Sequence, residues 1–182
     1  MTPHPEPPEL PANPGGEPGD CAAQAEVCRA IVAATTDAVI YADREGRIRL
    51  WNHGAEMLFG HRAADVLGAS LDVIIPEHLR AAHWKGYDAA LASGRLRLEG
   101  RPLTTRSMHK DGHKLYVDLG FGLVRDVHGN IAGAFATGRD CTARHASEVE
   151  LRARVAALEA ASKQPAAPGT GSPATPRGPA GA

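Results

Sequence analysis

The chain has 182 residues, of which 43% are hydrophobic, and a formal net charge of -1. This length suits one ordinary domain, and the balanced charge indicates neither a nucleic-acid-binding surface nor a strongly basic partner. The sequence contains no apolar run of about 18 residues that could span a membrane and no signal-peptide pattern at its start. We therefore expect a cytoplasmic protein that neither enters a membrane nor binds nucleic acid directly.

Composition divides the chain into a central region and two tails. Residues 1–21 are rich in Pro, Gly and acidic residues, residues 163–182 are rich in Pro, Ala and Gly, and both segments are poor in large apolar side chains. Such segments cannot bury enough apolar surface to offset their ordering entropy, so both tails are predicted to be disordered. The region between them is predicted to hold an N-terminal helix at 22–34, a globular domain at 35–142 and a C-terminal helix at 143–162.

The three cysteines give little functional information. Cys21, Cys28 and Cys141 are odd in number and fit no zinc-binding spacing. A disulfide scaffold is therefore disfavoured and a reducing compartment is favoured, with redox sensing by one of the thiols as a minor alternative.

The domain is predicted to begin with a β-hairpin. Val39 and Tyr41 alternate with their neighbours before a turn at 43–46, and Ile48 and Leu50 alternate after it. Asn52 is predicted to cap a short helix, which Gly60 ends.

A long helix and three more strands complete the predicted elements. The helix starts after Pro76 and runs to Ser93, with Gly94 as its stop. Strands are predicted at 95–108, around 115–123 and at 131–137. The alternation of apolar and polar residues is clearest in the second of these. We expect an α+β fold with a five-stranded antiparallel sheet, one face of which the middle helices cover.

Several short motifs then resemble one family. They are VIYADREGRIRLWN, AEMLFG, VLG, IIP, KDG and GRDCTAR, in that order over residues 35–144. Together they resemble the PAS domain family. The resemblance implies a sheet that cradles a cavity under the long helix, a role in signal sensing, and homodimers formed through flanking helices.

One histidine on the long helix is the candidate site residue. Leu79, His83 and Tyr87 are spaced i, i+4 and i+8, so they share a stripe that should face the sheet. His83 is then either a core histidine with a hydrogen-bond partner or a haem ligand, because haem iron takes a neutral imidazole inside an apolar cavity. Leu119 and Phe121 would form the opposite wall, and the small residues Ala82, Gly86 and Ala90 would leave room.

The segment 76–112 also resembles the haem-binding PAS domains of FixL-type oxygen-sensor kinases and direct-oxygen-sensor phosphodiesterases. This resemblance places the iron-ligating histidine at His83 and implies haem b. The distal side departs from both groups, since Arg101 stands where the phosphodiesterases have a ligating Met and Leu103 where both have an oxygen-contacting Arg. We therefore expect carbon monoxide or nitric oxide to be favoured over oxygen. Arg95, Arg97 and Arg101 are expected near the mouth of the cavity, where they form either a solvated strand edge or, if haem is bound, a group of which one member pairs with a haem propionate.

Two further histidines, His109 and His113, flank the turn at 110–112. They are expected to be solvated, and because their spacing spans a turn a metal site there is disfavoured.

The sequence lacks a Gly-rich phosphate loop and the GxSxG and HExxH motifs, so no enzymatic activity is expected. The favoured function is a haem-binding sensor of a diatomic gas or redox state, which signals through its C-terminal helix to a separate effector protein. The alternative is a cofactor-free PAS module that binds a small molecule or acts with a partner kinase or transcription regulator. A DNA-associated regulator is a weaker third possibility, because the chain lacks a basic patch.

Overall fold

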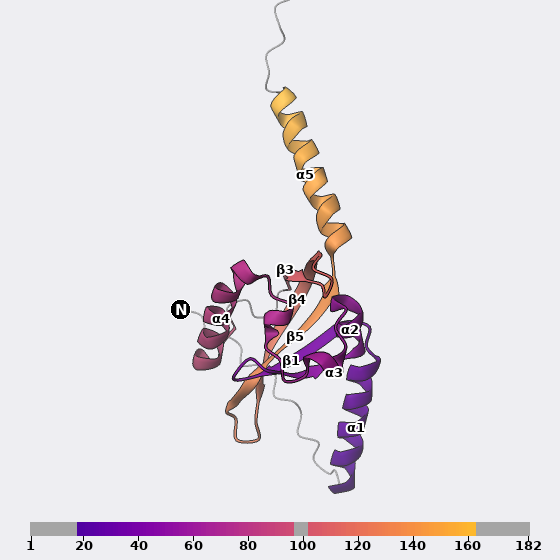
Figure 1. Cartoon of the computed structure of the whole chain (residues 1–182), viewed down its shortest axis with the longest axis vertical. Coiled ribbons are helices and arrows are strands. Elements are labelled where there is room, and N and C mark those ends of the chain that lie inside the picture. The colour runs from indigo at the N-terminus through magenta and orange to yellow at the C-terminus, as the bar shows by residue number, and fades with distance from the viewer. Residues whose placement is uncertain (1–17, 97–101, 163–182) are drawn as a thin grey trace, which may run out of the picture. The chain divides into compact units, whose positions relative to one another are not determined.

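The computed structural model describes residues 18–96 and 102–162 (Figure 1). The chain divides into two compact units, one up to Thr142 and one from Ala143 onward. The predicted disordered segments 1–17 and 163–182 lie outside the described residues.

The first unit is built on one antiparallel sheet, in the spatial order β2-β1-β5-β4-β3. Its strands are β1 (Ala38–Asp43), β2 (Ile48–Trp51), β3 (Leu103–Met108), β4 (Lys114–Arg125) and β5 (Ile131–Asp140). The predicted α+β class with five antiparallel strands is confirmed.

Two strand boundaries differ from the prediction. β3 begins at Leu103 rather than at residue 95, directly after Pro102, whose nitrogen has no hydrogen to donate to a neighbouring strand. β5 continues to Asp140 rather than ending at residue 137. It can do so because it lies between β1 and β4, and both neighbours still offer hydrogen-bonding partners there.

The described residues also form five α-helices and one 3-10 helix. They are α1 (Pro18–Ala34), α2 (His53–Phe59), α3 (Ala63–Val66), the 3-10 helix Leu71–Val73, α4 (Glu77–Ser93) and α5 (Thr142–Ser162). The predicted boundary between the N-terminal tail and the first helix was wrong, because α1 begins at Pro18 rather than at residue 22. A proline suits the first position of a helix, where its missing N–H leaves no bond unmade. Among the described residues, no helix combines the length and the apolarity needed to cross a bilayer.

The helix ends follow the predicted local chemistry. The Asn52 side chain accepts a hydrogen bond from Ala55 N at the start of α2. Gly60 and Gly94 end α2 and α4 with φ values of 74° and 66°, in the left-handed region that glycine reaches without steric cost. These three predictions are confirmed.

The hydrophobic core lies between the sheet and the short helices, which gather on one side of it in Figure 1. Phe59, Ile48 and Val117 are its largest fully buried side chains. Trp51 packs its ring 5.4 Å from that of Phe59 and donates its indole N–H to His61 O. We call this cluster, together with Asn52, the packed region.

Asn52 joins three segments inside the packed region. Its side-chain oxygen accepts from Val39 N at 2.7 Å and from Ala55 N at 2.9 Å. Its amide donates to the carbonyl oxygens of Val32, Thr35 and Asp37, at 3.0, 3.3 and 2.9 Å. This buried side chain therefore links the end of α1 to β1 and α2 with its hydrogen-bonding capacity used.

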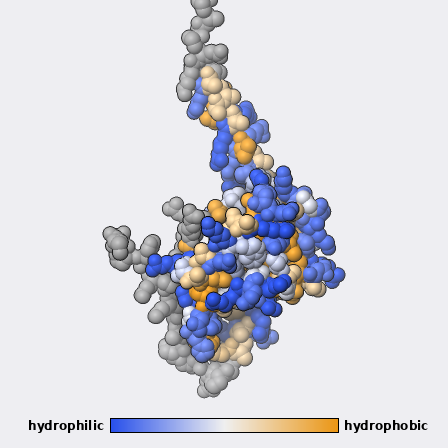
Figure 2. Space-filling model, turned by 60° about the vertical axis from the view of Figure 1, so that its left-hand side comes forward, coloured by the Kyte–Doolittle hydropathy of each residue, from blue (hydrophilic) through white to orange (hydrophobic). Residues whose placement is uncertain are grey.

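The α5 helix keeps apolar side chains in contact with solvent. Val149, Leu151, Val155 and Leu158 are all exposed, and Figure 2 shows orange and tan residues along this helix among blue ones. Glu148 forms ion pairs with Arg144 at 2.7 Å and with Arg152 at 3.6 Å, both at the i, i+4 spacing that supports an isolated helix.

Candidate functional site

A cavity of about 280 Å³ lies between α4 and the sheet. It is partly open to solvent, and apolar side chains dominate its lining. The lining residues are Ile40, Ala42, Leu71, Ala82, His83, Gly86, Tyr87, Ala90, Leu96, Leu103, Phe121, Ala134, Phe135 and Ala136. We call the cavity and these residues the hollow region.

Small residues on both walls create the cavity. Ala82, Gly86 and Ala90 form a stripe along α4, because they follow one another at a spacing of four residues. Across from them, Ala42 pairs with Ala134 on neighbouring strands β1 and β5, and Ala136 follows two residues later. Because neither wall carries a long side chain at these positions, α4 and the sheet leave a space that they cannot fill.

His83 lines this space and carries an unsatisfied atom. Its Nδ1 is buried without a hydrogen-bond partner among the described residues, a property shared there by His61 Nε2, which is not among the cavity-lining residues. Burial lowers the pKa of His83, and the more weakly acting charge of Asp72 opposes that shift. The imidazole is therefore neutral at pH 7, which is the form that ligates metal ions.

Two aromatic neighbours hold the His83 ring. Tyr87 stacks on it with ring centroids 5.9 Å apart, and Trp84 meets it edge-on at 4.9 Å. The Tyr87 hydroxyl donates to the Asp43 and Ala42 carbonyl oxygens, at 2.6 and 3.1 Å, which ties α4 to β1. Trp84 is fixed in turn by an indole hydrogen bond of 2.9 Å to Asp72 Oδ1.

The structure brings together His83, Tyr87, Leu103 and Phe121 of the predicted site residues. Leu79 does not line the described cavity, which starts at Ala82 and does not reach the first turn of α4. Leu119 is also displaced from the predicted wall: it packs against the core, where its Cδ2 lies 2.5 Å from the place that a Cβ on Gly138 would take. Neither leucine is therefore among the residues that line the described cavity.

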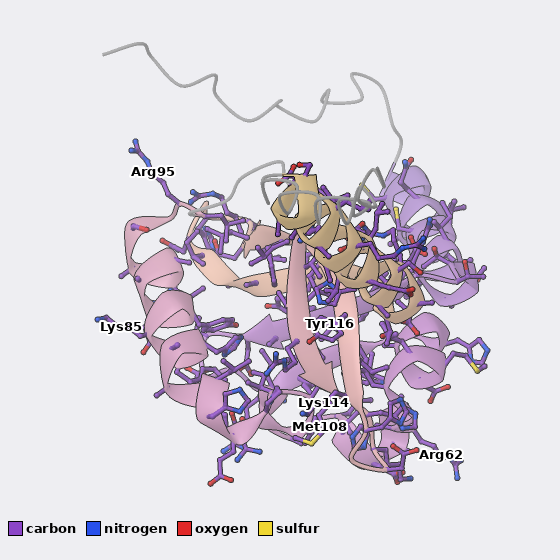
Figure 3. The ribbon with its side chains drawn as sticks, turned by 90° about the horizontal axis from the view of Figure 1, so that it is seen from above. Arg62, Lys85, Arg95, Met108, Lys114 and Tyr116 are labelled. Carbon is purple, nitrogen blue, oxygen red and sulfur yellow. The ribbon has the colours of Figure 1, made fainter. Side chains whose placement is uncertain are left out.

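The predicted arginine cluster is described only in part. Arg97 and Arg101 lie outside the described residues. Arg95 follows the end of α4, and its exposed side chain extends away from the sheet (Figure 3).

The sequence-based prediction missed the strand side of the cavity. Ile40, Ala42, Ala134 and Ala136 were not named, although alternation places each on the covered face of the sheet. The available signal was the pairing of small residues on adjacent strands, which becomes visible only once the strand register is known.

A second, shallower depression of about 360 Å³ includes Asp37, Asp118, Thr137 and Arg139. Its charged groups already have partners. Arg139 forms two hydrogen bonds of 2.9 Å to the Asp37 carboxylate, and Asp118 accepts one from Thr104. The hollow region, with its unsatisfied imidazole and apolar walls, is the better candidate for a ligand site.

Comparison with known proteins identifies the family to which this sheet and its helix-covered cavity belong. Residues 32–146 match the family model described as the PAS fold. The chain belongs to the PAS family. The predicted resemblance is thus confirmed, and the chain carries a sensory PAS domain.

Two curated proteins are similar to this PAS domain. One is an uncharacterized protein of Azorhizobium caulinodans, 35% identical over 92 residues, which make up 50% of this chain and 12% of that protein. The other is the oxygen sensor protein DosP of Escherichia coli, 27% identical over 112 residues, or 62% of this chain and 14% of DosP. The chain thus matches only a small part of each relative.

Among solved structures, an RNA-binding light-oxygen-voltage receptor aligns with a TM-score of 0.62 and 23% identity, over 84% of this chain and 41% of that one. At this identity the likeness supports the PAS fold and nothing finer.

Proposed function

We propose that this PAS domain senses a diatomic gas or a redox state through haem b held by His83. The observation that carries the proposal is a neutral imidazole at an apolar cavity, with one buried nitrogen that has no hydrogen-bond partner among the described residues. A buried polar atom in this condition costs about 1–3 kcal/mol, which a role in ligand binding would explain. The partial similarity to the E. coli oxygen sensor DosP agrees with this proposal.

The cavity residues fit parts of a haem site. Haem would supply an iron centre that binds a diatomic gas or changes its redox state. His83 would ligate it, Tyr87 would fix the imidazole ring from one side, and Leu103 and Phe121 would contact the porphyrin as apolar wall residues. None of the described lining residues is an arginine or lysine that could donate a charged hydrogen bond to bound oxygen, so we favour carbon monoxide or nitric oxide as the sensed gas.

A second candidate function is a cofactor-free PAS module that binds a small apolar molecule. The size of the cavity favours it, because about 280 Å³ is just below the range of roughly 300–1,000 Å³ for pockets that hold drug-sized ligands. A haem would have to extend through the open side of this space. Flavin bound as a cysteine adduct is disfavoured, since Cys21 and Cys28 are exposed and Cys141 is not among the described lining residues.

The flanking helices are the proposed output of the domain. Both α1 and α5 expose apolar side chains, including Ile31 and Leu158, and helices of this kind bury such residues by pairing with a second copy. The proposal is therefore a homodimer that passes the ligand signal to a separate effector protein, with no catalytic step in the chain itself.

The test is a haemin titration of the full chain, followed by absorption spectroscopy. We expect wild type to develop a Soret band at one haem per chain. His83→Ala should lose that band, whereas His78→Ala should keep it, because His78 is an exposed histidine on the same helix. Gly86→Leu should also weaken it, since Gly86 is one of the residues that line the cavity and a leucine side chain there would occupy space at its open side.

The outcomes separate the two functions. A Soret band that His83→Ala leaves unchanged, or no band at any haemin concentration, would overturn the haem proposal. A fluorescent apolar probe that binds wild type and His83→Ala equally, but not Gly86→Leu, would then support the cofactor-free module.

A further inference from the structure

Three metal-ligating side chains converge on the turn between β3 and β4, outside the cavity. The ligand atoms of His109, Asp111 and His113 all lie within 4.8 Å of one another. Asp111 Oδ1 is 2.9 Å from His109 Nδ1 and 2.5 Å from His113 Nδ1. The two imidazole rings stack with centroids 4.4 Å apart. Met108 and Lys114 form the strand pair that flanks the turn, and they lie close together in Figure 3.

The backbone holds this turn firmly in place. His109 N donates to His113 O at 3.0 Å, and Gly112 N donates to His109 O at 2.9 Å. Gly112 makes this tight turn possible with a φ of 90°. Lys110 N donates to Phe59 O at 2.9 Å, which attaches the turn to the end of α2. The three side chains therefore project from a turn whose backbone is hydrogen-bonded to the packed region.

His109 is also oriented by its surroundings. A Cβ on Gly60 would lie 2.3 Å from His109 Nε2, so the ring occupies the space that a side chain at position 60 would need. This contact turns Nε2 toward the end of α2 and leaves Nδ1 facing Asp111. Packing that fixes a ring in this way is what a ligating histidine requires of its neighbours.

We propose that His109, Asp111 and His113 form a binding site for a divalent transition-metal ion of the zinc class. Two imidazole nitrogens and one carboxylate oxygen suit Zn²⁺ and its neighbours in the first transition row, whereas Mg²⁺ and Ca²⁺ prefer oxygen ligands alone. Three protein ligands leave further coordination positions for water. The neighbouring charges of Lys110 and Lys114 oppose a cation, so the site is expected to be weaker than a four-ligand structural zinc site.

This site was disfavoured by the sequence because the two histidines are separated by a turn. The structure shows why that argument fails. In an antiparallel hairpin, residues flanking the turn become cross-strand neighbours with Cβ atoms about 5 Å apart, and the turn here is tight enough to stack the two rings. A turn of this kind brings its flanking histidines together instead of separating them.

The test is calorimetric titration of Zn²⁺ into the full chain without an added polyhistidine tag. All proteins should carry Cys21→Ser and Cys28→Ser, because both thiols are exposed and would bind zinc themselves. We expect saturable binding of one zinc per chain. Asp111→Asn and His113→Ala should each weaken it by at least about tenfold. Both side chains are exposed, so neither substitution should impair folding, which circular dichroism would check.

A matched control comes from the other hairpin turn, between β4 and β5. There His128 and Asp126 also occupy a tight turn, in which Asp126 Oδ1 accepts from His128 N. His128→Ala should leave the zinc affinity unchanged. The proposal is overturned if zinc does not bind with one-to-one saturation, or if either Asp111→Asn or His113→Ala binds it as tightly as wild type. In those cases the three side chains form only a hydrogen-bonded turn.

Discussion

The packed region and the hollow region lie against the same face of one sheet, yet they differ in how fully space is filled and in whether buried polar atoms have hydrogen-bond partners. In the packed region, Phe59 and Trp51 fill the space and Asn52 makes five hydrogen bonds to the backbone. In the hollow region, alanines and a glycine leave a cavity, and His83 Nδ1 has no partner among the described residues.

This difference indicates that the packed region stabilises the fold and that the hollow region binds the ligand. Filling of the core and satisfaction of buried polar groups stabilise a fold, and the packed region supplies both. A cavity forfeits packing contacts, so its presence beside a well-packed core points to binding. We expect substitutions in the packed region to reduce stability, and substitutions in the hollow region to change ligand binding with little loss of stability.

The largest expected effect is at Phe59. Phe59→Ala would remove a fully buried ring and lower the free energy of unfolding by about 3–5 kcal/mol, as large cavities in a core do. Denaturant unfolding would measure it. Met57→Ala, on the same helix but 72% exposed, should change stability by less than about 0.5 kcal/mol. Equal losses in the two variants would contradict the placement of the core.

A glycine in each region gives the most direct comparison. A Cβ at Gly54 would lie 2.2 Å from the Asp37 carbonyl oxygen, whereas a Cβ at Gly86 meets no atom within 4 Å. Gly54→Ala should therefore destabilise the protein by about 1–3 kcal/mol through overpacking. Gly86→Ala should stabilise it by about 0.5–1 kcal/mol, because alanine restricts the unfolded chain and favours the helix.

Thermal and denaturant unfolding of the two variants would test this pair. Opposite signs support the division of the molecule into a packed and a hollow region. A loss of stability in Gly86→Ala would mean that α4 lies closer to the sheet in solution than the cavity allows.

The sequence predicted the packed region better than the hollow one. Asn52, Gly60 and Gly94 were placed correctly because caps depend on local backbone geometry. His83 and Tyr87 were found on the cavity side because helical spacing alone puts them on one stripe. The alternation in β4 identified a buried face, but it did not show that Leu119 packs in the core while Phe121 reaches the cavity, since both have the same periodicity. That distinction depends on what lies above each position, which is a tertiary property.

A further prediction concerns Tyr87, whose hydroxyl is hydrogen-bonded to the sheet beside the cavity. Its hydroxyl donates to backbone carbonyl oxygens of β1, so Tyr87→Phe should cost about 1 kcal/mol of stability at pH 7. Burial raises the pKa of Tyr87 to about 12 from its ordinary value of 10.0. Between these values the unfolded chain loses the proton first, which stabilises the unfolded state.

The advantage of wild type over Tyr87→Phe should therefore be fully present below pH 10 and should decrease as the pH rises from 10 toward 12. Unfolding curves of both proteins at pH 7 and pH 11 would measure it, and lysine titration affects the two proteins alike and cancels in the difference. A difference that stays constant over this range would mean that the hydroxyl is solvated in both states, and that α4 is not tied to β1 by this residue.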